Sequence, residues 1–287
     1  MLELTGFGSA LRAIGMLYWL IAIAAIGFAV WKGKTIRAKV LWTGVAIAMF
    51  GFLPATALVE QAQRDAYAKE AWAYFKKKCE TESGEKIYKT FTGVKSVLVV
   101  KPLPPATDKD HFDQFWYGDP YSAPAHSQRG QYEAGILASR NAPASFGRSG
   151  PGFDFIEFLV SGNDGAKESY LKYFYPVGDG ERKQESIARP ISRFRISWED
   201  ISKPEDRKYW VAASRLRIVD STNNSAVAER IGYFIESGFG STSGGRKPWL
   251  AARGPATTCP QILNGDFEDR WFILKTLNPG KEKQDGK

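Results

Sequence analysis

Two uncharged stretches near the start of the chain decide its organisation: AIGMLYWLIAIAAIGFAVW at residues 13–31 and VLWTGVAIAMFGFLPATALV at residues 40–59. An α-helix rises about 1.5 Å per residue, so each stretch covers roughly 30 Å, the thickness of the hydrocarbon core of a bilayer. We therefore predict that residues 1–59 form a hairpin of two transmembrane helices, with residues 32–39 as the connection.

The connection, KGKTIRAK, carries four basic side chains and no acidic one. Short basic loops stay on the cytoplasmic side of a membrane, which places both termini on the opposite side. In a Gram-negative bacterium that side is the periplasm, so the pattern predicts an inner-membrane protein with a large periplasmic part. Trp31 and Trp42 flank the connection, where aromatic rings anchor helices at the interface.

Two other interpretations of the apolar stretches fit the residues less well. A cleaved signal peptide carries its positive charges before the apolar segment, whereas here the basic cluster follows it. A helical hairpin in the core of a soluble protein would need polar positions facing water, and neither stretch contains a charged residue.

The composition is basic, with 39 Lys and Arg against 31 Asp and Glu, which gives a net charge of +8. Such an excess commonly indicates nucleic acid or an anionic membrane surface as partner. Residues 1–64, however, hold six basic and two acidic side chains, so half of the excess lies in and beside the hairpin. We therefore expect contact with the lipid bilayer through two helices, and no nucleic-acid partner.

Residues 60–84 have the pattern of an amphipathic, membrane-proximal helix. Ala68, Trp72, Phe75 and Cys79 recur three or four positions apart, which places them on one face, and Gly84 is suited to end the helix. Beyond it, apolar and polar residues alternate as in strands. Strands are predicted at residues 85–91, 94–101, 153–160, 170–177, 193–198, 208–219, 227–236 and 270–274.

These strands predict a soluble α+β domain over residues 85–278, formed mainly by an antiparallel sheet with one solvated side. The Pro-rich segment 101–152 is predicted to be a long irregular excursion from this sheet. Residues 279–287 are predicted to form a disordered tail.

The chain has two cysteines, Cys79 at the end of the predicted helix and Cys259 near the end of the domain. In an oxidising periplasm such a pair is expected to form a disulfide, and the alternative is two separate buried thiols. No histidine stands near either cysteine in a recognisable motif, so a nucleophilic role is not expected.

Catalytic and metal-binding motifs are absent from the sequence. The two histidines, His111 and His126, lie in the Pro-rich segment among several aspartates, but DKDHFD has neither the HExxH spacing nor that of an EF-hand and is more typical of a solvated acidic loop. The Gly-rich run at residues 237–245 is typical of a long turn. We expect no enzymatic activity, no metal and no cofactor; an envelope hydrolase using the Asp- and His-rich loop is the weakest hypothesis.

Arginines alternate along two predicted strands, Arg193 with Arg195 and Arg215 with Arg217. If these strands pair, four guanidinium groups share one side of the sheet and need carboxylate partners. Those partners either lie within the chain, at Glu199, Asp200, Glu236 or the acidic loop, or belong to another protein. In the second case Tyr209 and Trp249 are candidate aromatic anchors.

Five motifs give a resemblance to a family: C…GEKIYKT from Cys79 to Thr90, YWVAASRLRIVD at 209–220, AERIGYF at 228–234, GGRKPW at 244–249 and CP at 259–260. Their order resembles that of uncharacterised membrane-anchored proteins of Gram-negative bacteria. The resemblance covers most of the chain after the hairpin, although FIESGFGS stands where an Asp-Gly type of turn is expected. It implies a link to type VI secretion effectors and supplies no catalytic residues.

The leading hypothesis is an inner-membrane-anchored periplasmic protein-binding domain. The resemblance implies that it is an immunity protein that neutralises a type VI secretion toxin by covering the toxin's site. The alternative is a structural or assembly component of a cell-envelope complex.

Overall fold

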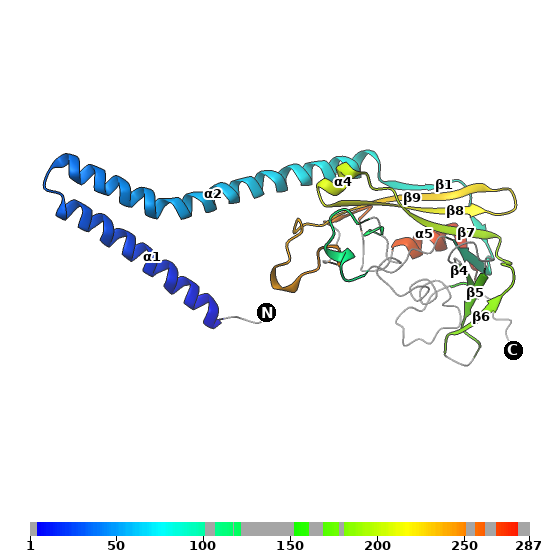
Figure 1. The fold of residues 1–287 in the computed structure, drawn as a ribbon. Helices are drawn as coiled ribbons and strands as arrows, with labels where there is room; N and C mark the ends of the chain where they lie inside the picture. Colours follow the sequence, from blue (N-terminus) through cyan, green and yellow to red (C-terminus); the bar gives the residue numbers. More distant parts are fainter. Residues whose placement is uncertain are drawn as a thin grey trace. The chain divides into compact units, whose positions relative to one another are not determined.

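The computed structural model describes residues 5–100, 107–116, 118–121, 152–160, 169–177, 181–250, 256–261 and 268–280. The chain divides into two compact units, Met1–Lys69 and Glu70–Lys287. Figure 1 traces the helices and strands of each unit. His126 and the predicted tail from residue 281 onward lie outside the described residues.

The first unit consists of helix α1 (Thr5–Lys32) and the first part of helix α2 (Ile36–Thr81). Each helix contains a stretch long and apolar enough to cross a membrane, as predicted. The turn is shorter than the predicted connection, because residues 36–39 are already helical. The hydroxyl of Thr35 accepts the Ala38 N–H at 3.2 Å and so caps the start of α2.

A proline interrupts the hydrogen bonding of α2. Pro54 lies inside the helix and has no N–H to donate to the carbonyl of Phe50, one turn earlier. The hydroxyl of Tyr18, on α1, donates to that carbonyl instead, and the rings of Tyr18 and Phe50 meet edge to face at 5.9 Å. The two helices are therefore linked at the point where α2 cannot satisfy its own backbone.

The second unit contains a mixed, mainly antiparallel sheet, in which the described residues contribute nine strands in the order β1-β9-β8-β7-β3-β4-β5-β6, with β10 paired to β9. Its strands are β1 (Gly84–Ile87), β3 (Ser96–Val99), β4 (Phe155–Val160), β5 (Ser169–Phe174), β6 (Lys183–Ile187), β7 (Phe194–Asp200), β8 (Val211–Asp220), β9 (Ser225–Ile235) and β10 (Thr258–Cys259). A separate parallel pair joins β2 (Phe91–Thr92) to β11 (Leu277–Asn278). The helical elements are α4 (Pro204–Lys208), α5 (Glu268–Thr276) and the short 3-10 turns η1 (Asp110–Phe112), η4 (Ser243–Gly245) and η5 (Pro248–Leu250).

The α+β class and the antiparallel character of β7, β8 and β9 are confirmed, but several details differ from the prediction. Strand β6 was not predicted, and the predicted strand 85–91 is divided between β1 and β2. Strand β3 pairs in parallel with both β4 and β7, so the sheet is not a simple meander. The predicted strand at residues 270–274 is wrong, because these residues belong to α5. Phe272, Ile273 and Leu274 are buried in succession, and so short an apolar run does not distinguish a helix from a strand.

The sheet is buried on both faces where β8 begins and β9 ends. Ile196, Leu216 and Ile218 lie in one hydrophobic core together with Phe272 and Ile273 of α5 (Figure 1). On the opposite face, residues of β8 and β9 pack against the last turns of α2. This second core contains Ala71, Phe75, Val211, Ala213, Tyr233, Ile235 and Cys259. The predicted apolar face of the helix is confirmed at Trp72, Phe75 and Cys79, whereas Ala71 and not Ala68 belongs to this core. Helix α2 ends at Thr81, slightly before Gly84.

The predicted disulfide is present. Cys79, in the last turns of α2, is bonded to Cys259 of β10 across a sequence separation of 180. In the chain-entropy description, closing so long a loop stabilises the folded state by about 5 kcal/mol. The end of α2 is therefore covalently fixed to the edge of the sheet.

The link between Tyr18 and Pro54 generates a prediction for the hairpin. Replacing Tyr18 by Phe leaves the Phe50 carbonyl without its donor and should lower the stability of the helix pair by about 1 kcal/mol. In the Pro54→Ala background residue 54 supplies its own N–H, so the same Tyr18→Phe change should cost almost nothing. Unfolding of the purified chain in mixed micelles of increasing denaturing detergent measures both values. An equal loss of stability in the two backgrounds would contradict the hydrogen bond from Tyr18 to the Phe50 carbonyl.

Candidate protein-binding face

Three of the four arginines singled out in the sequence, Arg195, Arg215 and Arg217, lie on one side of the neighbouring strands β7 and β8. Antiparallel pairing of β7 and β8 places Glu199 opposite Arg215 and Ser197 opposite Arg217. Side chains alternate along a strand, so Arg195 shares this side. Arg193 precedes β7, and its guanidinium group lies 5.0 Å from the Phe91 ring and 5.1 Å from the Phe194 ring, on the side of the hydrophobic core. We call Arg195, Arg215 and Arg217 the arginine face.

Each of the four arginines has a partner within the chain. Arg193 forms a two-pronged pair with Asp220, with Nη2 to Oδ2 at 2.6 Å and Nε to Oδ1 at 3.0 Å. This pair holds the pKa of Asp220 far below its usual range. Arg195 donates to the amide oxygen of Asn224, in the turn that joins β8 to β9.

Arg215 and Arg217 are held more loosely. Arg215 lies 3.7 Å from both Glu199 and Glu229, and Arg217 lies 3.8 Å from Glu229. The side chains of Arg217 and Glu199 are about half exposed, at 50% and 49%. Exposed pairs of this length contribute little to stability, so the guanidinium groups stay available for shorter bonds to carboxylates of another molecule.

The expected partners within the chain were only partly correct. Glu199 faces the arginines as predicted, but Asp200 pairs with the buried Arg207 at 2.7 Å. Glu236 is fully buried, pairs with Arg246 and accepts the N–H groups of Gly238 and Gly240 at 2.8 and 2.7 Å. These bonds form the long Gly-rich turn that the sequence predicted.

The two candidate aromatic anchors lie elsewhere. Tyr209 packs on Tyr74 of α2 with ring centroids 4.8 Å apart, and its hydroxyl bonds to Glu70. Trp249 is fully buried, and its indole N–H donates to the carbonyl of Asp113 at 2.6 Å. Tyr209 therefore helps to hold α2, and the Trp249 ring is not on the surface of this structure.

The Asp- and His-rich segment is more packed than a solvated loop. His111 is only 7% exposed, and burial lowers its pKa. Asp119 is fully buried and accepts the Ser214 hydroxyl at 2.5 Å, while Asp108 pairs with Lys247. Within the described ranges, no three His, Cys, Asp or Glu side chains are grouped as metal ligands. The prediction of a solvated acidic loop is therefore wrong for the described part of this segment, in which His111 and Asp119 are buried.

A polar cluster that the sequence did not reveal fixes the end of α2 to the sheet. Tyr74 donates to Asp206 at 2.7 Å, Lys78 donates to Glu82 at 2.7 Å, and Tyr233 also donates to Glu82 at 2.7 Å. We call these five residues the polar clamp. The spacing of Lys78 and Glu82 is visible in the sequence, but Asp206 and Tyr233 lie more than a hundred residues away.

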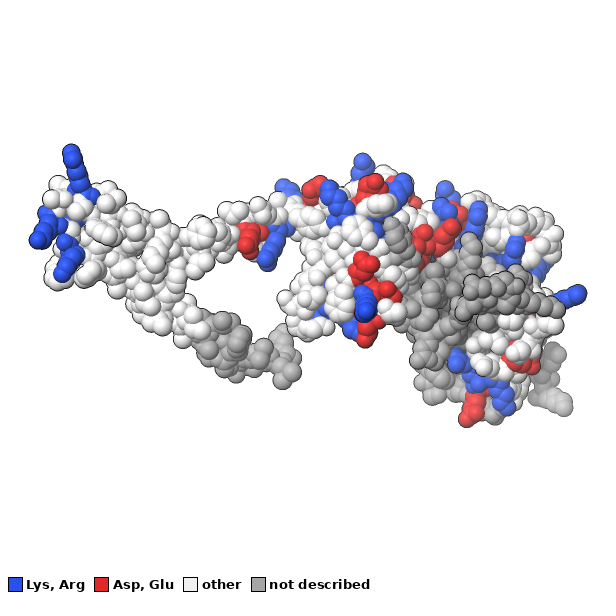
Figure 2. All heavy atoms as spheres, in the orientation of Figure 1, with Lys and Arg blue, Asp and Glu red and all other residues white. Residues whose placement is uncertain are grey.

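Figure 2 shows how charge is distributed over the side of the molecule in view. Basic and acidic side chains are interspersed over the last part of α2 and the neighbouring strands, whereas the turn between α1 and α2 shows only basic ones. On the side in view, the described residues of the second unit therefore do not form the broad basic surface that is typical of nucleic-acid binding.

No known protein family, curated protein or solved structure matches the chain.

The polar clamp predicts how stability depends on pH. Burial, followed by bonds to carboxylates, raises the pKa of Tyr74 and Tyr233 well above the usual value near 10. The contribution of each tyrosine is therefore complete below about pH 10 and is lost as the pH rises further. Tyr233→Phe should cost about 1–3 kcal/mol at pH 8, and the difference from the natural chain should shrink at pH 11.

Denaturant unfolding at the two pH values measures this effect. The matched control is Tyr88→Phe, since Tyr88 is 62% exposed. A Tyr233→Phe deficit that stays constant across this range would refute the role of its hydroxyl.

Proposed function

We propose that this chain is a membrane-anchored protein-binding domain of the Gram-negative cell envelope. In this proposal α1 and α2 cross the inner membrane and the second unit lies in the periplasm. The length and apolarity of the two helices, and the basic turn between them, support the anchor. The disulfide between Cys79 and Cys259 is compatible with an oxidising compartment.

The arginine face is the observation that carries the binding role. Among the described residues, Arg215 and Arg217 pair with two carboxylates, Glu199 and Glu229, at distances above 3.5 Å, and Arg195 donates to the uncharged amide of Asn224. A partner with acidic side chains would form shorter, better-aligned bonds at this site. The rigid three-stranded backbone of β7, β8 and β9 would present these groups in a fixed arrangement.

Within this function we favour an immunity role, in which the domain covers the site of a toxin delivered by type VI secretion. The anchor would concentrate the protecting domain at the membrane where such a toxin arrives. The role is based on the resemblance of the five sequence motifs, and the arginine face supplies a surface that can be tested.

The proposed topology predicts the behaviour of reporter fusions. A reporter that is active only in the periplasm should be active when fused after Lys287, and inactive when inserted after Lys34 in the turn. The reverse pattern, or an inactive reporter at both positions, would exclude the periplasmic placement.

The immunity role predicts conditional lethality. Deleting the gene should kill cells only when a toxin encoded directly beside it is present, and the natural chain should restore survival. The double variant Arg215→Gln, Arg217→Gln should restore it poorly, because the partner's carboxylates lose their donors while the size of the side chains is nearly kept. Thermal unfolding of the purified variant checks that the fold is retained.

The control for this experiment is Lys77→Gln, which removes an exposed basic charge from α2 outside the arginine face. Survival of the deletion strain in the presence of the toxin would exclude the immunity role. Co-purification of several envelope proteins at a fixed ratio would favour the assembly component instead.

A further inference from the structure

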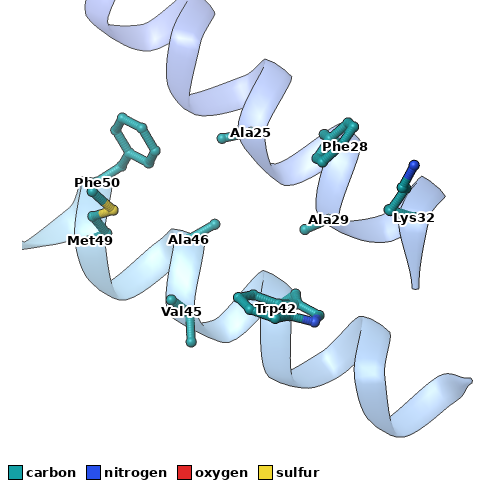
Figure 3. Close-up of a pocket in the computed structure, with 9 residues that line it drawn as sticks. All are labelled: Ala25, Phe28, Ala29, Lys32, Trp42, Val45, Ala46, Met49 and Phe50. Carbon is teal, nitrogen blue, oxygen red and sulfur yellow. The ribbon is translucent and has the colours of Figure 1, made fainter. Parts of the chain in front are cut away.

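A pocket of about 470 Å³ lies between α1 and α2, close to their connecting turn. Figure 3 shows that the methyl groups of Ala25, Ala29 and Ala46 point into the gap between the helices. Larger side chains flank them, among them Phe28, Trp42 and Met49. The small residues therefore leave a groove that is bounded by apolar and aromatic walls, and its volume is typical of small-molecule sites, which span roughly 300–1,000 Å³.

One end of this groove is positively charged. Lys32 is among the residues that line it, and its ammonium group lies 5.9 Å from the Phe28 ring and 5.7 Å from the Trp31 ring. Lys34, Arg37 and Lys39 follow in the turn, and no acidic residue occurs anywhere between Thr5 and Val59. Figure 2 shows this group of basic side chains at the turn. The charge at the mouth therefore has no acidic counterpart in the hairpin sequence.

Apolar side chains beside the groove are exposed in the isolated chain. Phe28, Val45 and Met49, which line the groove, are each at least half exposed, which is the expected state of residues that face lipid. A groove open to such a surface is continuous with the hydrocarbon of a bilayer. A small soluble anion would leave the apolar walls uncovered, and an uncharged lipid would leave Lys32 without a counterion.

We propose that the groove binds an anionic phospholipid, with one acyl chain between α1 and α2 and the phosphate group at Lys32. The acyl chain covers the methyl groups of the three alanines, and the indole of Trp42 lies at the depth of the headgroup, where tryptophan is favoured. Basic side chains at the end of an apolar groove between helices are typical of sites for anionic headgroups. This inference rests on the proposed membrane anchor.

The test uses the full chain reconstituted into nanodiscs of equal parts phosphatidylglycerol and phosphatidylcholine with identical acyl chains. Native mass spectrometry after release counts the lipids that remain bound. The natural chain should retain phosphatidylglycerol preferentially, and Lys32→Gln should reduce this preference about fivefold, since a basic side chain near the headgroups contributes on the order of 1 kcal/mol. The matched control, Lys34→Gln, removes the same charge from the turn outside the groove and should change the preference less than twofold.

A second pair of variants tests the acyl-chain part of the site. Ala46→Leu fills the groove and should reduce the retention of both lipids, whereas Ala48→Leu adds the same atoms at an exposed position of α2 outside the groove. Circular dichroism checks that both variants keep their helical content. Equal retention by the two leucine variants would overturn the acyl-chain site.

The same preparation separates this inference from the membrane anchor itself. Equal retention of the two lipids by the natural chain, or equal effects of Lys32→Gln and Lys34→Gln, would overturn the lipid site while leaving the anchor intact. Release of the chain from vesicles by alkaline carbonate would overturn the anchor and the lipid site together.

Discussion

The fold of the second unit depends on the attachment of the last turns of α2 to the sheet, which is made by three kinds of interaction. Ala71 and Phe75 pack against Val211 and Tyr233, the polar clamp joins helix and strands by hydrogen bonds, and the disulfide adds a covalent link. Because these interactions lie together, loosening one exposes the others to water. Strands β8 and β9 are thus buried on both faces at this end. Antiparallel strands more commonly have one face in the core and the other in water.

The elements that the sequence predicted best were those with a long, regular pattern. Two uncharged stretches indicated α1 and the first part of α2, and alternation of apolar and polar residues indicated β7, β8 and β9. Strand β6 has no such alternation, because Lys183–Gln184–Glu185 are exposed at the edge of the sheet. The parallel pairing of β3 could not be predicted either, since its partners β4 and β7 lie far away in the chain and the register depends on tertiary contacts.

The arginine face illustrates what local periodicity can and cannot provide. The two-residue repeat of a strand was sufficient to place Arg215 and Arg217 on one side. It did not reveal that Asp220, the last residue of β8, would bind Arg193, or that Asn224, in the following turn, would bind Arg195. The prediction that Trp249 is an accessible anchor was wrong, because its burial depends on residues that contact it only in the folded chain. The Arg207 guanidinium group lies 5.1 Å from the Trp249 ring, and the ring centroid of Trp210 lies 5.1 Å from that of Trp249.

Pro54 has a consequence for how the protein is made. In the proposed membrane anchor, α2 must satisfy its backbone without water, and at Phe50 the hydroxyl of Tyr18 on α1 supplies the hydrogen bond that Pro54 cannot. Since α1 is synthesised before α2, this proposal implies that the donor is already in the bilayer when its acceptor arrives.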